Sequence, residues 1–236
     1  MITFANNRLT KQETTLRRFH EKCLVFGICL AACAAAGNSC AQDTPGVSAG
    51  VFLENRTDSK VEGESLSFDY YGIRLKARTE RIVEGFVDIG TQALDWKPLT
   101  ADAAGCFGLG GTLWATRSED GIFPADVGIY GSCHVANYTL TTDSGRNTDA
   151  KYLRYMIQGE VRAFEGGIVH PYLRAGIMNS KLEPNDESVI TSSQVNATKP
   201  AINVGVELDV TERLVIGVEG NYSEAVGGAI RLDYWF

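Results

Sequence analysis

The chain has 236 residues and a formal net charge of −7, with 29 Asp and Glu residues against 22 Lys and Arg residues. This acidic balance argues against a nucleic-acid-binding protein, which would carry a basic patch. Beyond the N-terminal region no run of 18 or more apolar residues occurs, so no conventional transmembrane helix is predicted.

The N-terminal region has the three parts of a secretory signal peptide. A basic flank at residues 17–22 precedes an apolar run at residues 23–36, and Ser39-Cys40-Ala41 supplies the small residues of a cleavage site. The sequence therefore predicts a signal peptide over residues 1–41 and a single mature domain over residues 42–236. Leu30-Ala31-Ala32-Cys33 supports a competing interpretation, because it looks like a lipobox whose processing would leave an acylated Cys33 and a lipid-anchored surface protein.

Two of the six cysteines, Cys106 and Cys133, remain after cleavage at Ala41. Both would lie in an oxidising compartment, on consecutive antiparallel segments. A turn centred near Glu119-Asp120 would place them directly opposite each other, whereas a register one residue away would place them on opposite faces of the sheet. A disulfide is therefore a hypothesis that depends on the register.

The mature chain alternates apolar and polar residues with a period of two, which predicts strands with two different faces. Tyr71, Ile73 and Leu75, for example, interleave with Arg74 and Lys76. Ten such segments are distinguished, most of them near the nine to eleven residues that a tilted strand needs to cross a bilayer. Ten strands are therefore favoured, with eight as the alternative. Residues 125–141 fit less well and suggest a bulge that changes the phase.

The connectors alternate between tight turns and longer polar loops, the longest at residues 179–199. Short turns at one rim and long loops at the other are typical of an outer-membrane barrel. Aromatic residues near segment ends suit the interfacial girdles of such a barrel. These residues are Tyr71, Trp96, Tyr138, Tyr152, Tyr172, Tyr222, Tyr234 and Phe236.

The second face of the segments carries six basic and seven acidic residues, a near balance that suits an enclosed lumen in which charges pair. A soluble β-sandwich, with this face in solvent, is the main alternative. Lys76 and Asp209 are two of the thirteen. The eleven others are the expected lumen charges: Arg74, Glu84, Asp88, Arg154, Glu160, Arg162, Arg174, Glu207, Glu219, Arg231 and Asp233.

The alternating body, "HPYLRAGI" at residues 170–177 and the C-terminal "ERLVIGVEGNYSEAVGGAIRLDYWF" resemble the small outer-membrane β-barrel proteins of Gram-negative bacteria. The resemblance implies an all-β, closed, antiparallel, up-and-down transmembrane barrel in the outer membrane, surrounded by outer-membrane lipid. It also implies that the barrel-assembly machinery reads the last strand through Ile230, Leu232, Tyr234 and Phe236. To close the sheet, this strand must pair with the strand that follows Pro45.

The sequence contains no strong catalytic motif. A protease similar to the omptins would need paired acidic residues and a His at the extracellular rim, but His134 has no obvious Asp neighbour and His170 is expected beside a tight turn. A barrel phospholipase would need a Ser-His pair on the lipid face, for which Ser132 and His134 are the candidates. We therefore expect a protein that is not an enzyme and has no cofactor or metal.

The lumen charges leave two interpretations open. They fill the interior and pair, or they line a narrow solute path. The long connector at residues 179–199 adds the hypothesis of an extracellular ligand at the outer loops. The expected role is accordingly structural, small porin-like or surface-binding.

Overall fold

A computed structural model describes residues 46–61, 64–79, 82–96, 99–116, 125–142, 145–163, 168–186, 196–223 and 225–236. The expected signal peptide, its lipobox alternative and the Glu119-Asp120 turn lie outside these described residues. No helix with the length and apolar character of a membrane span occurs in the described ranges.

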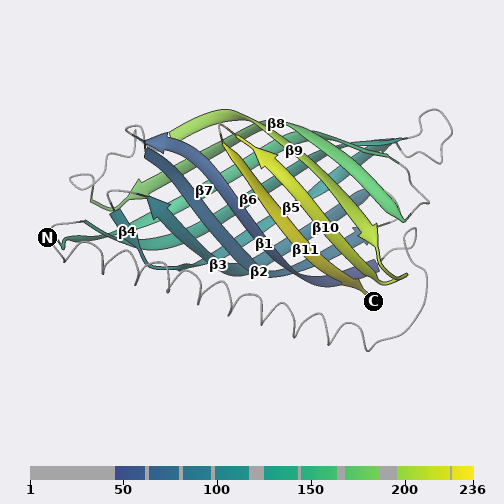
Figure 1. The fold of residues 1–236 in the computed structure, drawn as a ribbon, viewed down its shortest axis with the longest axis horizontal. Coiled ribbons are helices and arrows are strands. Elements are labelled where there is room, and N and C mark those ends of the chain that lie inside the picture. The colour runs from purple at the N-terminus through teal and green to yellow at the C-terminus, as the bar shows by residue number, and fades with distance from the viewer. Residues whose placement is uncertain are drawn as a thin grey trace, which may run out of the picture. The chain divides into compact units, whose positions relative to one another are not determined.

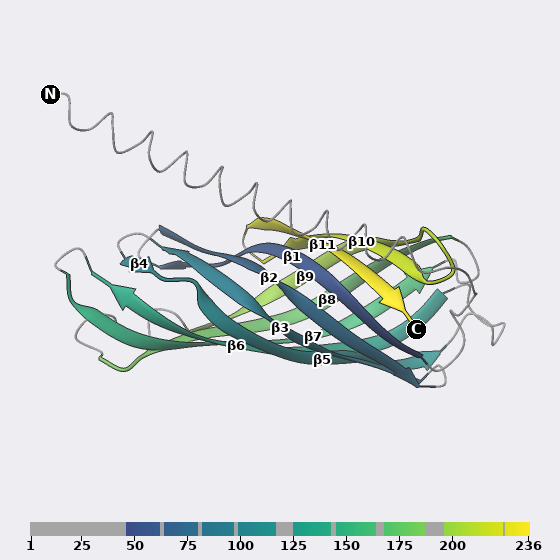
Figure 2. The same cartoon turned by 90° about the horizontal axis from the view of Figure 1, so that it is seen from below.

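The described residues form ten long strands and one short strand, β4. Their bounds are β1 (Gly46–Val61), β2 (Glu64–Thr79), β3 (Val83–Trp96), β4 (Leu99–Ala101), β5 (Ala104–Thr116), β6 (Ala125–Thr141), β7 (Asn147–Ala163), β8 (Val169–Pro184), β9 (Asn196–Asp209), β10 (Leu214–Tyr222) and β11 (Val226–Trp235). The long strands pair antiparallel in chain order, and β11 returns to β1, so the sheet closes into a barrel (Figures 1 and 2). The predicted up-and-down barrel of ten strands is confirmed.

The closing seam runs along β1 and β11. Eight register pairs join them, from Ser48 opposite Trp235 to Asn55 opposite Gly228. The backbone N–H of Phe236 donates a further hydrogen bond to the carbonyl oxygen of Val47, at 3.0 Å. The last strand therefore pairs with the strand after Pro45, as predicted, and is held up to its final residue.

The strands extend further than the alternation indicated. The connector expected after the first segment is mostly strand, because β1 and β2 stay paired up to Val61 and Glu64. The long connector expected at residues 179–199 is also shorter, since Asn179 pairs with Thr198 and Lys181 with Asn196. In the sequence, polar residues at the ends of these strands look like loop residues because they interrupt the apolar alternation.

The two faces of the barrel exchange polarity along its length. We call the half next to Gly46 and Phe236 the proximal half, and the half next to the β1–β2 and β6–β7 connections the distal half. On proximal β6 the outward side chains are apolar, as at Ile129, and on distal β6 they are polar, as at Thr139. The inward side chains change in the opposite sense, from Asp126 to Leu140.

This exchange explains why residues 125–141 fitted the alternation poorly. The β6–β7 register is unbroken from Ala125 opposite Ala163 to Thr141 opposite Asn147, so the suggested bulge in this segment is wrong. The register shift in this hairpin lies instead on β5, between Trp114 and Thr116. What changes within β6 is the polarity of each face.

The outer face of the proximal half is an apolar band. Large side chains are strongly exposed all round it, including Ile129 at 59% and Ile157 at 61%. A soluble monomer rarely exposes so large a contiguous apolar surface. Closing the sheet pairs the backbone groups that lipid cannot satisfy, so this band is the surface of a membrane-spanning barrel and not the core of a sandwich.

The aromatic girdle differs in part from the expectation. Tyr71, Tyr222, Tyr234 and Phe236 are on the outward side of their strands, as expected. The others expected in the girdle point into the lumen and are buried, which corrects that prediction: Trp96, Tyr138, Tyr152 and Tyr172. Strand ends alone do not distinguish a girdle aromatic from a lumen aromatic, because both faces reach the rim.

The hypothetical disulfide is not formed. The β5–β6 register pairs Cys106 with Ala136 and Cys133 with Leu109. Cys106 is buried on the lumen side, Cys133 lies on the opposite face, and both thiols are free. The register therefore corresponds to the alternative in which the two cysteines occupy opposite faces.

Candidate functional site

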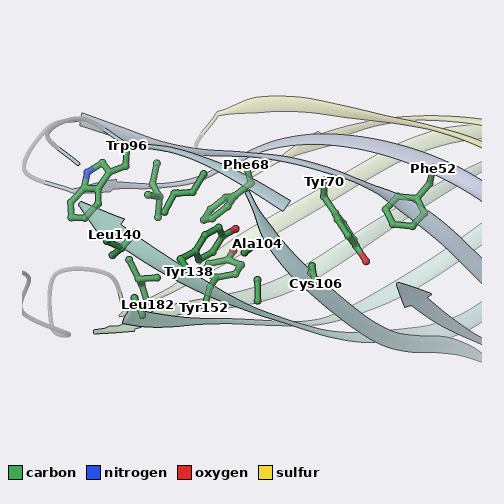
Figure 3. Packing of buried hydrophobic residues seen from close by; sticks show 14 residues of the cluster. Phe52, Phe68, Tyr70, Trp96, Ala104, Cys106, Tyr138, Leu140, Tyr152 and Leu182 are labelled. Carbon is green, nitrogen blue, oxygen red and sulfur yellow. The ribbon is translucent and has the colours of Figure 1, made fainter. Parts of the chain in front are cut away.

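The lumen is the candidate site, and its distal half is filled by apolar side chains. Fourteen buried residues, none more than 7% exposed, form this distal cluster: Phe52, Leu66, Phe68, Tyr70, Leu94, Trp96, Ala104, Cys106, Ala136, Tyr138, Leu140, Ala150, Tyr152 and Leu182. Trp96 and Leu140 lie toward the rim, and Tyr70 and Phe52 lie deeper in the barrel (Figure 3). Strand β4 continues the wall here, since Leu99 pairs with Trp96 and Ala101 with Leu140.

Rings from distant parts of the wall meet inside this cluster. Phe68 on β2 and Tyr152 on β7 have ring centroids 4.4 Å apart. Strands β3, β5 and β6 separate β2 from β7 on one side of the barrel, and five strands separate them on the other. Figure 3 shows the Phe68 ring pointing toward Tyr138 and Tyr152. The contact spans the lumen, so the distal half is closed at this level.

The proximal half of the lumen is filled by charged side chains. The structure brings all eleven expected lumen charges into it. None of these eleven side chains is more than 13% exposed. Lys76 joins them through an ion pair with Asp233, at 2.5 Å. Glu54 and Arg56 were missed because they continue the β1 face whose preceding lumen residue, Phe52, is apolar.

The first charged group surrounds His134, where Arg74 donates two hydrogen bonds of 2.6 Å to Asp88. Asp88 Oδ2 lies 3.3 Å from His134 Nε2, and Arg154 Nη2 lies 3.3 Å from His134 Nδ1. A guanidinium can only donate, so Nδ1 must accept and the proton must sit on Nε2, facing Asp88. His134 is therefore held as one neutral tautomer. Arg154 continues across the lumen to Glu54, at 3.3 Å.

The second charged group is centred on Glu160, which has no exposed surface. Its carboxylate accepts hydrogen bonds from Thr112 Oγ1 at 2.9 Å and from Arg162 Nη2 at 3.0 Å. Arg174 Nε lies 3.2 Å from the same carboxylate. Two buried guanidinium groups therefore share one buried carboxylate.

A third charged group joins Glu207, Glu219 and Arg231. Arg231 Nη2 donates to Glu207, which also pairs with Arg162 Nη1 at 3.4 Å. Glu219 accepts from Tyr172 Oη at 2.7 Å, from Asn203 Nδ2 at 2.6 Å and from Arg174 Nη1 at 3.1 Å. These carboxylates link side chains from β7 to β11 across the interior.

Small residues make room for this filling. A Cβ on Gly108 would lie 2.4 Å from the His134 ring, and one on Gly110 would lie 2.6 Å from the Phe86 ring. Both glycines belong to the "GCFGLGG" stretch of β5, which runs as a strand and opens no helix. Glycine is required here because large lumen side chains from neighbouring strands lie directly above the backbone.

The histidine and serine candidates all face the lumen. Ser132 and His134 share this face and not the lipid face that a phospholipase pair would need. His170 is a buried β8 residue whose Nε2 lies 3.1 Å from Asp209 Oδ2, and not the turn residue that was expected. Asp88, the neighbour that His134 lacked in the sequence, comes from β3, 46 positions away. Within the described ranges, no group of three or more His, Cys, Asp or Glu residues is placed to hold a metal ion.

Small cavities lie between the lumen side chains of the described residues, and two of them adjoin the charged groups. One, of about 30 Å³, lies in the proximal half among Lys76, Arg78, Glu84 and their neighbours. The other, of about 40 Å³, lies beside the His134 group. A buried water needs roughly 10–15 Å³ of such space, so each cavity has room for a few waters.

The residues of the expected assembly signal end the chain on β11. Ile230 and Phe236 are exposed, Tyr234 is half-buried and Leu232 is buried. The rings of Tyr234 and Phe236 meet edge to face, with centroids 5.3 Å apart. The segment thus presents an aromatic pair at the proximal rim, next to the seam.

Comparisons with known proteins find only distant structural similarity. No family model matches the chain, and no curated protein matches it. Among solved structures it is similar to the translocator domain of the autotransporter NalP from Neisseria meningitidis, with 10% identity, 95% of this chain and 98% of that chain covered, and a TM-score of 0.49. An outer membrane channel from Pseudomonas putida F1 has 9% identity, coverages of 85% and 99%, and a TM-score of 0.48.

A further similar structure is Ail, the attachment invasion locus protein of Yersinia pestis, with 13% identity, coverages of 82% and 99%, and a TM-score of 0.40. The closed sheet and the apolar outer band of this chain identify its fold without these similarities. This is the fold of an outer-membrane β-barrel. Buried side chains, apolar in the distal half and charged in the proximal half, occupy its lumen.

Proposed function

We propose that this protein is an outer-membrane barrel with a closed lumen, whose role is structural and surface-presenting and not that of a pore. The contact between Phe68 and Tyr152 across the distal lumen carries this proposal. The ion-paired proximal half supports it, because charges that neutralise one another in close contact fill space and leave only small cavities.

Planar-bilayer recordings test this proposal. The refolded protein is expected to give no conductance steps in potassium chloride, sodium chloride or calcium chloride, because no continuous water path crosses the distal cluster. Heat-modifiable migration on a gel would establish that the inserted protein is folded. A double variant, Phe68→Ala with Tyr152→Ala, removes the rings that meet across the lumen. Its conductance is compared with that of the unaltered protein. Steady currents from the unaltered protein that scale with salt would refute the closed lumen and favour the narrow solute path.

Surface binding through the distal half is the second candidate function. The outward side chains there are polar, as at Asn137, Thr139 and Lys151, while the interior is apolar. A polar outer surface is poorly suited to lipid, so the distal half would stand clear of the bilayer like a small soluble domain. We also propose that this rim faces the cell exterior and binds a ligand there. The protein would reach the outer membrane by export through a cleaved signal peptide. The expectation that the protein is not an enzyme stays a prediction.

Removal of Phe236 tests the proposed contact with the barrel-assembly machinery. Without Phe236 the chain loses an exposed aromatic at the proximal rim and the backbone bond to Val47. We expect a several-fold lower yield of folded protein in the outer membrane, measured by membrane fractionation. Phe236→Tyr keeps the ring and the backbone bond, so its yield should equal that of the unaltered protein. Equal yields for all three proteins would contradict the proposed signal.

A further inference from the structure

The cavity of about 40 Å³ beside His134 has a strongly cationic wall. It is lined by two carboxylates, Glu54 and Glu219, and by five guanidinium groups. The five are Arg56, Arg74, Arg154, Arg174 and Arg231. Five positive and two negative groups leave three positive charges in excess around a cavity that contains no other charged wall residue, since His134 is neutral.

Both carboxylates of the wall are already engaged. Glu54 accepts from Arg56 Nε at 2.8 Å and from Arg154 Nη1 at 3.3 Å. Glu219 accepts from Tyr172, Asn203 and Arg174. The other lumen carboxylates do not line this cavity; Asp88, for example, binds the Nε and Nη2 edge of Arg74. Behind the wall, Asp88 pairs with Arg74, Glu160 with Arg174 and Glu207 with Arg231, so the excess of positive charge is confined to the groups that line the cavity.

Three terminal Nη nitrogens of these arginines have no acceptor among the described residues. Arg74 uses Nε and Nη2 on Asp88, which leaves Nη1. Arg56 uses Nε on Glu54 and turns Nη1 toward the sulfurs of Met156 and Met178, at 3.5 and 3.3 Å, which leaves Nη2. Arg231 uses Nη2 on Glu207, which leaves Nη1. These three Nη groups keep some accessible surface, so a small acceptor in the cavity can reach them.

Aromatic rings hold the guanidinium groups in place. Arg74 lies 4.1 Å from the ring centroid of Phe86 and 5.2 Å from that of Phe52. Arg174 lies 4.2 Å from the ring centroid of Tyr130 and 4.6 Å from that of Tyr172. Such stacking fixes the planes of the donors, and the surrounding low dielectric strengthens their attraction for negative charge.

We propose that this cavity binds a small monovalent inorganic anion, with chloride as the representative ligand. Its volume suits one small ion with a water or two, and is far below the 300 Å³ or more of ordinary organic-ligand pockets. The anion would accept hydrogen bonds from the three free Nη groups and lie against the positive groups of the wall. It is a resident ion that stabilises the filled lumen, so the proposal does not depend on whether the barrel conducts.

Thermal unfolding of the refolded barrel tests the site. We expect the unfolding midpoint to rise as sodium methanesulfonate is replaced by sodium chloride at constant ionic strength, because a ligand that binds only the folded state stabilises it. Methanesulfonate is too large for the cavity and controls for screening. Diffraction from crystals grown in sodium bromide should show an anomalous peak in the cavity.

Two variants separate this site from general charge effects. Arg56→Gln removes a cavity arginine while Glu54 keeps Arg154, and it is expected to abolish the chloride-dependent shift. Arg78→Gln removes a lumen cation that lines the other cavity, and it should keep the shift. A bromide peak in the unaltered protein would support the site even if Arg56→Gln failed to fold. Identical midpoints in chloride and methanesulfonate, or a cavity that holds only water in the bromide crystals, would overturn the proposal.

Discussion

Glu160→Gln is expected to destabilise the barrel by about 3–5 kcal/mol, the usual cost of removing one partner from a buried ion pair. Glu160 is fully buried and holds Arg162 and Arg174, and it also accepts from Thr112. Glutamine nearly preserves its shape but removes its charge. Two guanidinium groups would then keep only their partners in the third charged group, Glu207 and Glu219.

Urea unfolding of protein refolded into phospholipid vesicles measures this effect. A lower midpoint with an unchanged slope would show a loss of stability without a change in the unfolded state. Glu183→Gln is the matched control, because Glu183 pairs with Lys181 at the partly exposed outer face of β8, and its midpoint should not move. A Glu160→Gln barrel as stable as the unaltered one would contradict the buried ion-pair network.

Ile157→Arg and Thr139→Arg are expected to differ by about 2–4 kcal/mol, although both place an arginine on the outer face. Ile157 lies in the proximal apolar band at 61% exposure, where an arginine near the bilayer midplane costs that amount. Thr139 lies on distal β6, opposite Asp149, where the outer face is polar. Its arginine would remain in water and face a carboxylate.

Folding titrations into vesicles compare the two variants directly. Ile157→Arg should shift the unfolding midpoint strongly and Thr139→Arg hardly at all. A similar loss from both variants would place the distal half within the bilayer. That result would reject the division of the barrel into a lipid-facing proximal half and a solvent-facing distal half.

The alternation predicted the faces well wherever the proximal pattern holds. Val83 to Ile89 on β3 and Leu173 to Ile177 on β8 show apolar outward residues against inward Asp88 and Arg174, as the period of two requires. The pattern failed on the distal part of β6, because an apolar residue there faces the lumen. A sequence does not say on which side of a strand the apolar environment lies.

The sequence predicted which charged residues line the candidate site, but not which of them contact one another. The eleven expected lumen charges follow from alternation, since a strand that faces lipid on one side must place its charges on the other. Their partners were not predictable, because Asp88 meets His134 across 46 positions and Arg56 meets Met178 across 122. Strands adjacent in the chain predict neighbours along the wall, but contacts through the lumen depend on tilt and on side-chain length.

By itself, the sequence favoured a closed sheet of ten strands over one of eight and predicted that the last strand pairs with the strand after Pro45. Local alternation specifies strands, and a C-terminal strand that ends on Phe236 must pair with β1 to satisfy its backbone. The tertiary structure decided the contact of Phe68 with Tyr152 across the lumen, the opposite faces of Cys106 and Cys133 and the cavity lined by arginines. Each of these depends on register and on contacts across the barrel, and a one-residue slip in register would move every side chain to the other face.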